Sequence, residues 1–155
     1  MSDKEIKNVF VSHFHEDEDS IKQMKDLLGE DYSIRNYSVT SDKYNNAKDD
    51  DYIKSLLRPL IHEASTVFCL IGPNTHDSEW VDWELQTAHK MGKQIIGVFL
   101  RGAKDSDVPD ALNKYADSIV GWNKENIEKA INGEPTFVDA SGTTRPYGGT
   151  DRTQC

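Results

Sequence analysis

Short apolar runs alternate with amphipathic segments along most of this chain, and this alternation constrains the fold more than any other feature. The apolar runs at residues 66–71 and 94–100 have the length and composition of strands that are covered on both faces. The segments at residues 19–28 and 51–64 carry apolar side chains at the spacings of three and four that place them on one face of a helix. In the second segment this expected buried stripe is Ile53, Leu56, Leu57, Leu60 and Ala64. Strands that alternate with helices in this way predict an α/β fold, a parallel sheet with helices on both faces.

The full pattern contains five strands and five helices. Five strands favour the three-layer, flavodoxin-like order 2-1-3-4-5, in which the winding reverses between the first and third strands. Ligands of such sheets bind beyond the carboxyl ends of those two strands. The expected strands are residues 9–13, 32–39, 66–71, 94–100 and 118–121, and the expected helices are residues 19–28, 51–64, 78–91, 111–115 and 124–131.

The chain of 155 residues has the length of one domain. We expect this domain to extend over residues 1–132, because all of the strand and helix patterns lie there. From residue 133 the composition changes to Gly, Pro, Thr and Asp, which predicts an extended tail over residues 133–155. The polar stretch at residues 40–51 is expected to form a long exposed loop.

The charge and the cysteines restrict the surroundings of the protein. The net charge of −9 argues against non-specific binding to nucleic acid or to an anionic membrane surface. Cys69 lies inside an apolar run and Cys155 is the last residue, so we expect no structural disulfide and a reducing compartment. The sequence has no apolar stretch of the roughly 18 residues that a membrane span needs. A soluble cytoplasmic protein is therefore expected.

Glu84 is a charged residue that is expected to face the protein interior and not the solvent. On a helix that begins near residue 78, Val81, Leu85 and Ala88 form the buried stripe, and Glu84 lies close to that stripe. A carboxylate turned towards the protein interior is costly unless a cation or a reaction uses it. A glutamate that pairs with a nearby lysine, or that makes a capping interaction at the helix edge, explains the spacing equally well.

The place of this helix in the chain favours the functional interpretation. Residues 13–16 follow the first expected strand, residues 72–76 follow the third, and the third strand leads directly into the helix that carries Glu84. In the expected strand order these segments meet at the edge where ligands bind. The fold and the side-chain pattern therefore select the same pocket, and Glu84 is the first candidate for catalysis.

Residues 13–17 (HFHED) also match the pattern H-x-H-x-D, which supplies two imidazoles and a carboxylate to the metal ion of metallohydrolases. Such a site needs further ligands at later positions, and the remaining histidines are His62, His76 and His89. His62 and His89 are expected on helix surfaces. The sequence therefore favours a loop lined by two histidines without a metal.

Two other ligand classes of flavodoxin-like folds do not fit the chain. A flavin site needs a loop rich in Ser, Thr and Gly after the first strand, where this chain has His13, Phe14 and His15. A phospho-accepting receiver needs an aspartate at the end of the third strand, where this chain has Ile71, Gly72 and Pro73.

Several segments together resemble a known family. Residues 8–13 (NVFVSH), followed by an acidic helix start, resemble the first strand of TIR domains. Residues 65–74 and 78–85 (SEWVDWEL) resemble the third TIR strand and the following S-x-W-x-x-x-E-L helix, and residues 92–98 resemble the fourth strand. The likeness covers residues 6–132 and is greatest to the bacterial TIR-like group that includes the TIR subunit (ThsB type) of the Thoeris anti-phage defence system.

The resemblance implies an NAD-consuming enzyme with Glu84 as its catalytic residue. Such domains cleave the bond between nicotinamide and ribose, and in the Thoeris type they release ADP-ribose as a cyclic isomer that activates an effector with a messenger-sensing domain. NAD is then a substrate, no cofactor and no metal are expected, and a homo-oligomer is an open possibility. Phe14 and Trp80 are candidates to stack on a ring of NAD, and N–H groups after Gly72 are candidates to hold its pyrophosphate. The expected substrate-binding residues are Ser12, His13, Phe14, His15, Gly72, Asn74 and Trp80.

Two alternatives remain open at this level. In the first, the protein is a non-catalytic TIR-like interaction module, whose acidic surface serves a basic partner and whose loop at residues 40–51 matters more than Glu84. In the second, less favoured because ligands are missing, the histidine motif makes it a metallohydrolase. NAD that stays intact with the pure protein would indicate the first, and stoichiometric zinc or manganese the second.

Overall fold

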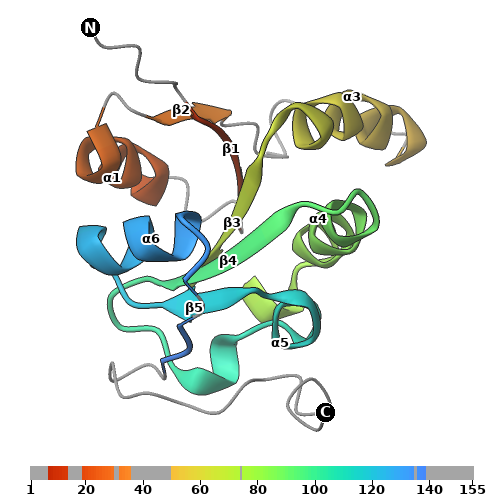
Figure 1. Ribbon diagram of the computed structural model, residues 1–155. Helices are drawn as coiled ribbons and strands as arrows, with labels where there is room; N and C mark the ends of the chain where they lie inside the picture. The colour runs from red at the N-terminus through yellow and green to blue at the C-terminus, as the bar shows by residue number, and fades with distance from the viewer. Residues whose placement is uncertain are drawn as a thin grey trace, which may run out of the picture.

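In the part of the chain that the structure describes, five parallel strands form one sheet in the order β2-β1-β3-β4-β5 (Figure 1). The predicted α/β fold with a parallel sheet is thus confirmed. The strands are β1 (Lys7–Ser12), β2 (Tyr32–Arg35), β3 (Thr66–Ile71), β4 (Gln94–Phe99) and β5 (Ser118–Val120). The computed structural model describes residues 7–13, 19–29, 32–35, 50–73, 75–134 and 136–138. Most of the loop expected at residues 40–51 lies outside the described residues.

Helices cover both faces of the sheet and give the molecule three layers (Figure 1). Helices α3, α4 and α5 pack on one face, and helices α1 and α6 pack on the other. These are α1 (Asp19–Leu28), α3 (Asp50–Glu63), α4 (Glu79–Lys90), α5 (Asp110–Tyr115) and α6 (Lys124–Ile131), with the short 3-10 helices η3 (Thr75–Asp77) and η4 (Asp105–Asp107). Among the described residues, no helix combines the length and the apolar character that crossing a membrane requires.

Side chains of β1 alternate between the two faces of the sheet. Phe10 lies in the core beneath α3, α4 and α5, whereas Val11 lies in the core beneath α1 and α6. Ser12, two residues after Phe10, therefore points to the α4 side, where Cys69 of β3 is its partner in the register. Gly97 of β4 is in turn the partner of Cys69. A row of small residues thus crosses three strands beneath the helices.

This row of Ser12, Cys69 and Gly97 lets the helices approach the sheet closely. A Cβ atom added to Gly97 would lie 2.6 Å from Cδ2 of Leu112 on α5 and 3.3 Å from Cδ1 of Ile71. Leu112 therefore occupies the space above Gly97. At the other end of the row, the small side chains of Ser12 and Cys69 leave room beneath α4 for a longer side chain.

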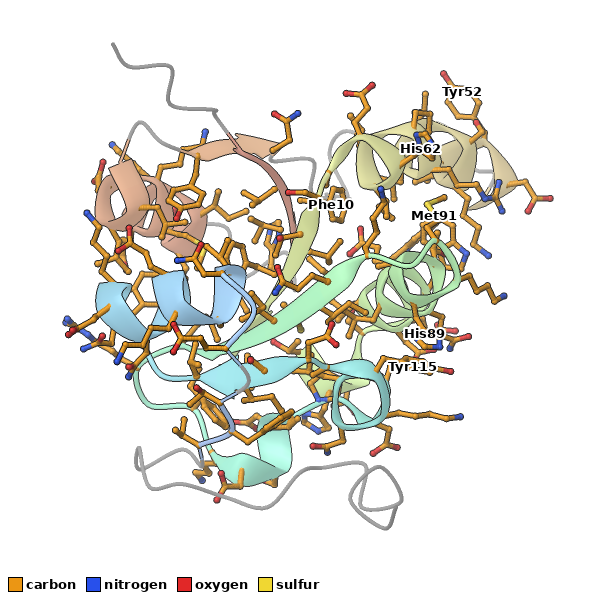
Figure 2. The ribbon with its side chains drawn as sticks, viewed as in Figure 1. Phe10, Tyr52, His62, His89, Met91 and Tyr115 are labelled. Carbon is orange, nitrogen blue, oxygen red and sulfur yellow. The ribbon has the colours of Figure 1, made fainter. Side chains whose placement is uncertain are left out.

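One predicted core position is wrong. Leu56 was expected on the buried stripe of α3, but it is 39% exposed, while Ile53, Leu57 and Ile61 are buried. Successive helix residues are about 100° apart, so Leu56 points well away from the direction that Leu57 shares with Ile53 and Ile61. Tyr52, one turn earlier, is also exposed and projects from the outer end of α3 (Figure 2).

The first part of the expected tail belongs to the sheet. Phe137 forms a parallel bridge with Ile119 of β5, with the N–H of Ile119 donating to the carbonyl of Thr136 at 2.8 Å and that of Val138 donating to the carbonyl of Ile119 at 2.9 Å. Phe137 and Val138 are buried in the α3–α5 core. These residues cover an edge of the sheet that would otherwise present unpaired backbone groups.

Replacement of Phe137 by alanine should measure how much this segment stabilises the fold. Phe137 is only 6% exposed, so Phe137→Ala should lower the free energy of unfolding by about 3–5 kcal/mol in urea denaturation. Tyr52→Ala is the matched control, because this aromatic side chain is 54% exposed and its loss should change stability by no more than about 0.5 kcal/mol. Equal losses at the two positions would show that residues 136–138 contribute nothing to the core.

Candidate active site

Glu84 lies in the interior, on the side of α4 that faces the sheet. Ser78 caps this helix, since its Oγ accepts a hydrogen bond from the N–H of Val81 at 3.2 Å. The cap sets the start of the helix, and its periodicity then directs Val81 and Leu85 into the core with Glu84 beside them. Glu84 is 4% exposed, whereas Asp82 is exposed. The inward orientation expected for Glu84 is therefore confirmed.

The carboxyl of Glu84 is hydrogen-bonded to the end of β1. The hydroxyl of Ser12 donates to Oε1 of Glu84 at 2.6 Å, and both side chains are buried. Ser12 is the last residue of β1, so this contact lies at the carboxyl edge of the sheet, next to β3. Two of the sequence-predicted site residues are thus in direct contact.

Burial changes the acidity of Glu84. Loss of solvation raises its pKa from the ordinary value of 4.5 to about 8, and the hydrogen bond from Ser12 partly opposes that rise. Desolvation disfavours the ionised form, whereas a donor to the carboxylate favours it. The carboxyl is therefore mostly protonated at neutral pH, and modest changes in its surroundings are enough to ionise it.

His13, directly after β1, is buried and turned back on its own strand. Its Nδ1 atom lies 3.2 Å from the carbonyl oxygen of Val11. Since a carbonyl oxygen only accepts, a hydrogen bond at this contact requires a proton on Nδ1. The other residues of the predicted histidine motif, residues 14–17, lie outside the described residues. Within the described ranges, no group of three or more His, Cys, Asp and Glu side chains is arranged to hold a metal ion.

The turn after β3 is held by hydrogen bonds between its own residues. The N–H of Gly72 donates to Oγ1 of Thr75 at 2.8 Å, and the N–H of Thr75 donates to the carbonyl of Gly72 at 3.2 Å. Oγ1 of Thr75 also donates to the carbonyl of Leu70 at 3.1 Å. These N–H groups are already paired and are not free to hold a phosphate. Asn74, the other candidate in this turn, lies outside the described residues.

Thr75 was missed by the sequence interpretation. It is fully buried and holds the connection between β3 and α4 in one shape. A threonine three residues after a glycine, at the start of a turn, is the kind of local signal that predicts such a side-chain bond to the backbone.

Trp80 precedes Glu84 by four residues on α4, about one turn, so the two side chains leave the helix on the same side. Its ring makes an edge contact with Trp83, with the centroids 6.1 Å apart and the planes at 81°. The cationic groups of Lys54 and Arg58 on α3 each lie 5.6 Å from the centroid of Trp83. Trp83 on α4 therefore contacts α3 through cation–π interactions. Both tryptophans are half-buried against the core.

A cleft of about 430 Å³ opens beside these tryptophans. Ser12, Gly72 and Glu84 do not line it, so the structure does not bring Trp80 and Glu84 into one described cleft. The cleft lies around the start of α4, and its lining residues are Lys54, His76, Asp77, Ser78, Glu79, Trp80, Asp82, Trp83, Pro109 and Asp110.

A known protein family matches the stretch of the chain that contains the Ser12–Glu84 pair. The family model of the Thoeris protein ThsB, TIR-like domain, matches residues 10–105. The chain belongs to this family. The match includes both Ser12 and Glu84, which confirms the resemblance inferred from the sequence. No protein with a curated description matches this member of the ThsB family.

Among solved structures, this TIR-like domain is similar to the Clostridium botulinum CMP N-glycosidase BcmB. The TM-score is 0.52 and the sequence identity is 17%, with 81% of this chain and 98% of the other covered. A likeness at this level of identity establishes the common fold and leaves the substrate to be argued from the site.

Stability should depend on pH through Glu84. Between pH 4.5 and about 8 the unfolded carboxyl is ionised while the folded one stays protonated, so the free energy of unfolding falls by up to about 1.4 kcal/mol per pH unit. Glu84→Gln keeps an acceptor for Ser12 and cannot ionise. We expect this variant to be close to the unchanged protein in stability at pH 5 and more stable by a few kcal/mol at pH 8.

Urea denaturation of Glu84→Gln and of the unchanged protein, at pH 5 and at pH 8, measures this difference in stability. Glu79→Gln, on the exposed side of the same helix, is the matched control and should change stability by no more than about 0.5 kcal/mol at either pH. A Glu84→Gln variant that is less stable than the unchanged protein at pH 8 would contradict the raised pKa.

Proposed function

We propose that this protein is an NAD-consuming TIR enzyme, which cleaves the nicotinamide–ribose bond and produces a cyclic ADP-ribose-type signal in anti-phage defence. The observation that carries the proposal is the buried Glu84 carboxyl, bonded to Ser12 at the carboxyl edge of β1. A nearly solvent-free carboxyl costs stability, and this cost is typical of groups retained for chemistry. Membership of the ThsB TIR-like family supports the same conclusion.

The first step breaks the bond between C1′ of the ribose and the ring nitrogen of nicotinamide. The electron pair of this bond leaves with the ring, so nicotinamide departs as a neutral molecule and needs no general acid. Positive charge develops on the ribose, as in glycoside hydrolysis. An ionised Glu84 stabilises that charge or holds the ribose hydroxyls, and its effect is large because the site is nearly free of water.

The second step adds a nucleophile to C1′. Attack by a hydroxyl or ring nitrogen at the adenosine end of the same molecule closes the ring of a cyclic ADP-ribose, whereas attack by water gives linear ADP-ribose. A hydroxyl or water that attacks C1′ releases its proton to solvent. The low exposure of Glu84 favours the first outcome, because a site that excludes water suppresses the competing hydrolysis.

The proposed reaction also implies a substrate, a diffusible product and a cellular location. NAD is a substrate that is consumed, and the chemistry needs no bound cofactor. The cyclic product is a small molecule that diffuses to an effector with a messenger-sensing domain. A cytoplasmic location, where NAD is abundant, fits this scheme.

Incubation of the purified protein with NAD, with and without extract from phage-infected cells, tests the proposal. Mass spectrometry should detect nicotinamide and a cyclic ADP-ribose isomer. Glu84→Gln should reduce nicotinamide release by at least about 10²-fold, as for other groups that stabilise developing charge. Glu125→Gln, at an exposed position of α6 on the other face of the sheet, should retain normal turnover. A folded Glu84→Gln protein that still turns over normally would refute the assignment.

The rate of NAD cleavage should increase with pH. The ionised form of Glu84 is the active one in this mechanism, and its pKa is about 8. The kcat/KM reports the protonation state of the free enzyme, so it should rise about tenfold per pH unit below pH 8 and level off above it. A rate that is flat between pH 6 and 9 would show that ionisation of Glu84 does not control the reaction.

The protonated state of Glu84 favours a second candidate, hydrolysis of the N-glycosidic bond of a nucleoside monophosphate such as CMP. A neutral pyrimidine is a poor leaving group until it is protonated, and a carboxyl that keeps its proton at neutral pH can donate it. BcmB, which shares the fold, is described as a CMP N-glycosidase. With CMP as substrate the kcat/KM should fall above pH 8, in contrast to the rise expected with NAD.

A further inference from the structure

We propose that Ser12 is a positioning residue, which holds the Glu84 carboxyl in its reacting orientation and does not itself bind the substrate. The proposal refines the function proposed above and gives Ser12 a different role from the substrate contact expected from the sequence. It stands on the geometry of the pair and on the burial of Ser12.

The Ser12 hydroxyl gives its one donor proton to Glu84. A serine hydroxyl has one proton, and here that proton is donated to Oε1 of Glu84 at 2.6 Å. Ser12 is 0% exposed and Glu84 is 4% exposed. Ser12 therefore offers no exposed surface to a substrate.

The position of Ser12 in the sheet gives it the rigidity that a positioning residue needs. It ends β1, a central strand paired with β2 on one side and β3 on the other. Glutamate has three rotatable side-chain bonds, and a fixed donor at one oxygen selects a single orientation from them. Oε1 is then held against the strand, and Oε2 is the oxygen left for the substrate.

The bond also favours the ionised carboxyl, because a donor to a carboxylate stabilises its charge. Removal of the Ser12 hydroxyl should therefore raise the pKa of Glu84 further above its ordinary value. The titratable residues next to Ser12 in the sheet are His13, which follows it in the chain, and Cys69, its register partner on β3. Ser12→Ala changes neither of these residues, so a shift in the Glu84 titration would report the loss of the Ser12 hydroxyl.

Ser12→Ala tests the proposal in two independent ways. Carbon-13 NMR of protein labelled at glutamate carboxyls should show the Glu84 titration, identified by its absence in Glu84→Gln, moved up by about one pH unit. With NAD as substrate, kcat at pH 7.5 should fall about tenfold, the rising limb of the kcat/KM profile should move up with the titration, and KM should stay within twofold.

Two further variants complete the design. Ser118→Ala is the matched control, because Ser118 is also buried and its Oγ also makes a hydrogen bond, from the N–H of Thr136 at 3.0 Å at the start of β5. It should leave both the titration and the pH profile unchanged. Ser12→Thr keeps a hydroxyl on the same strand position and should restore most of the titration and of kcat, also where Ser12→Ala folds poorly.

The outcomes separate this inference from the proposed function. An increase in KM with an unchanged titration would make Ser12 a substrate contact and overturn the proposal. If the unchanged protein does not cleave NAD, the NMR titration alone decides: a shifted Glu84 titration supports positioning by Ser12, and an unshifted one overturns it.

Discussion

The hydrogen bond from Ser12 to Glu84 is the contact on which the candidate site depends. It joins β1 to α4 across 72 positions of the sequence and holds a carboxyl in a nearly dry place. The sheet makes room for it, because Ser12 and Cys69 are small neighbours in the register while Leu112 fills the space above Gly97. A buried acid with a raised pKa destabilises the fold above its ordinary titration range. An apolar residue would remove that cost, and this is the physical reason for proposing a chemical role for Glu84.

Much of this arrangement was predictable from the sequence, because it follows from local periodicity. The apolar run of β3 and the alternation around it gave the parallel sheet, and the spacing of Val81, Leu85 and Ala88 gave the inward direction of Glu84. The same periodicity failed for Leu56, where an apolar residue at a spacing of three from Ile53 lies outside the buried arc. Hydrophobic spacing therefore identifies a helix reliably and the edges of its buried face less well.

The rest was not predictable, because it depends on contacts between distant parts of the chain. No spacing rule connects Ser12 with Glu84, and the sequence indicated only that the segments carrying them meet at one edge of the sheet. The pKa of about 8 is a consequence of burial in the assembled core. The turn at Gly72 is a similar case: the glycine suggested free N–H groups for a phosphate, but Thr75 already accepts one of them. A pyrophosphate that binds here must therefore be held by groups other than the N–H groups of Gly72 and Thr75.

The protonation state of Glu84 couples its chemistry to the charge of the substrate. Two unit charges about 4 Å apart interact by about 4 kcal/mol at an effective dielectric constant of about 20, which corresponds to about three pKa units. The cationic ring of NAD, bound beside Glu84, would thus ionise a carboxyl whose pKa is about 8 in the free protein. A neutral base would leave the proton in place. Under the proposed function, the same buried group would act as a stabilising anion towards a substrate with a cationic ring and as an acid towards a substrate with a neutral base. The charge of the base in the bound substrate would decide between these two roles.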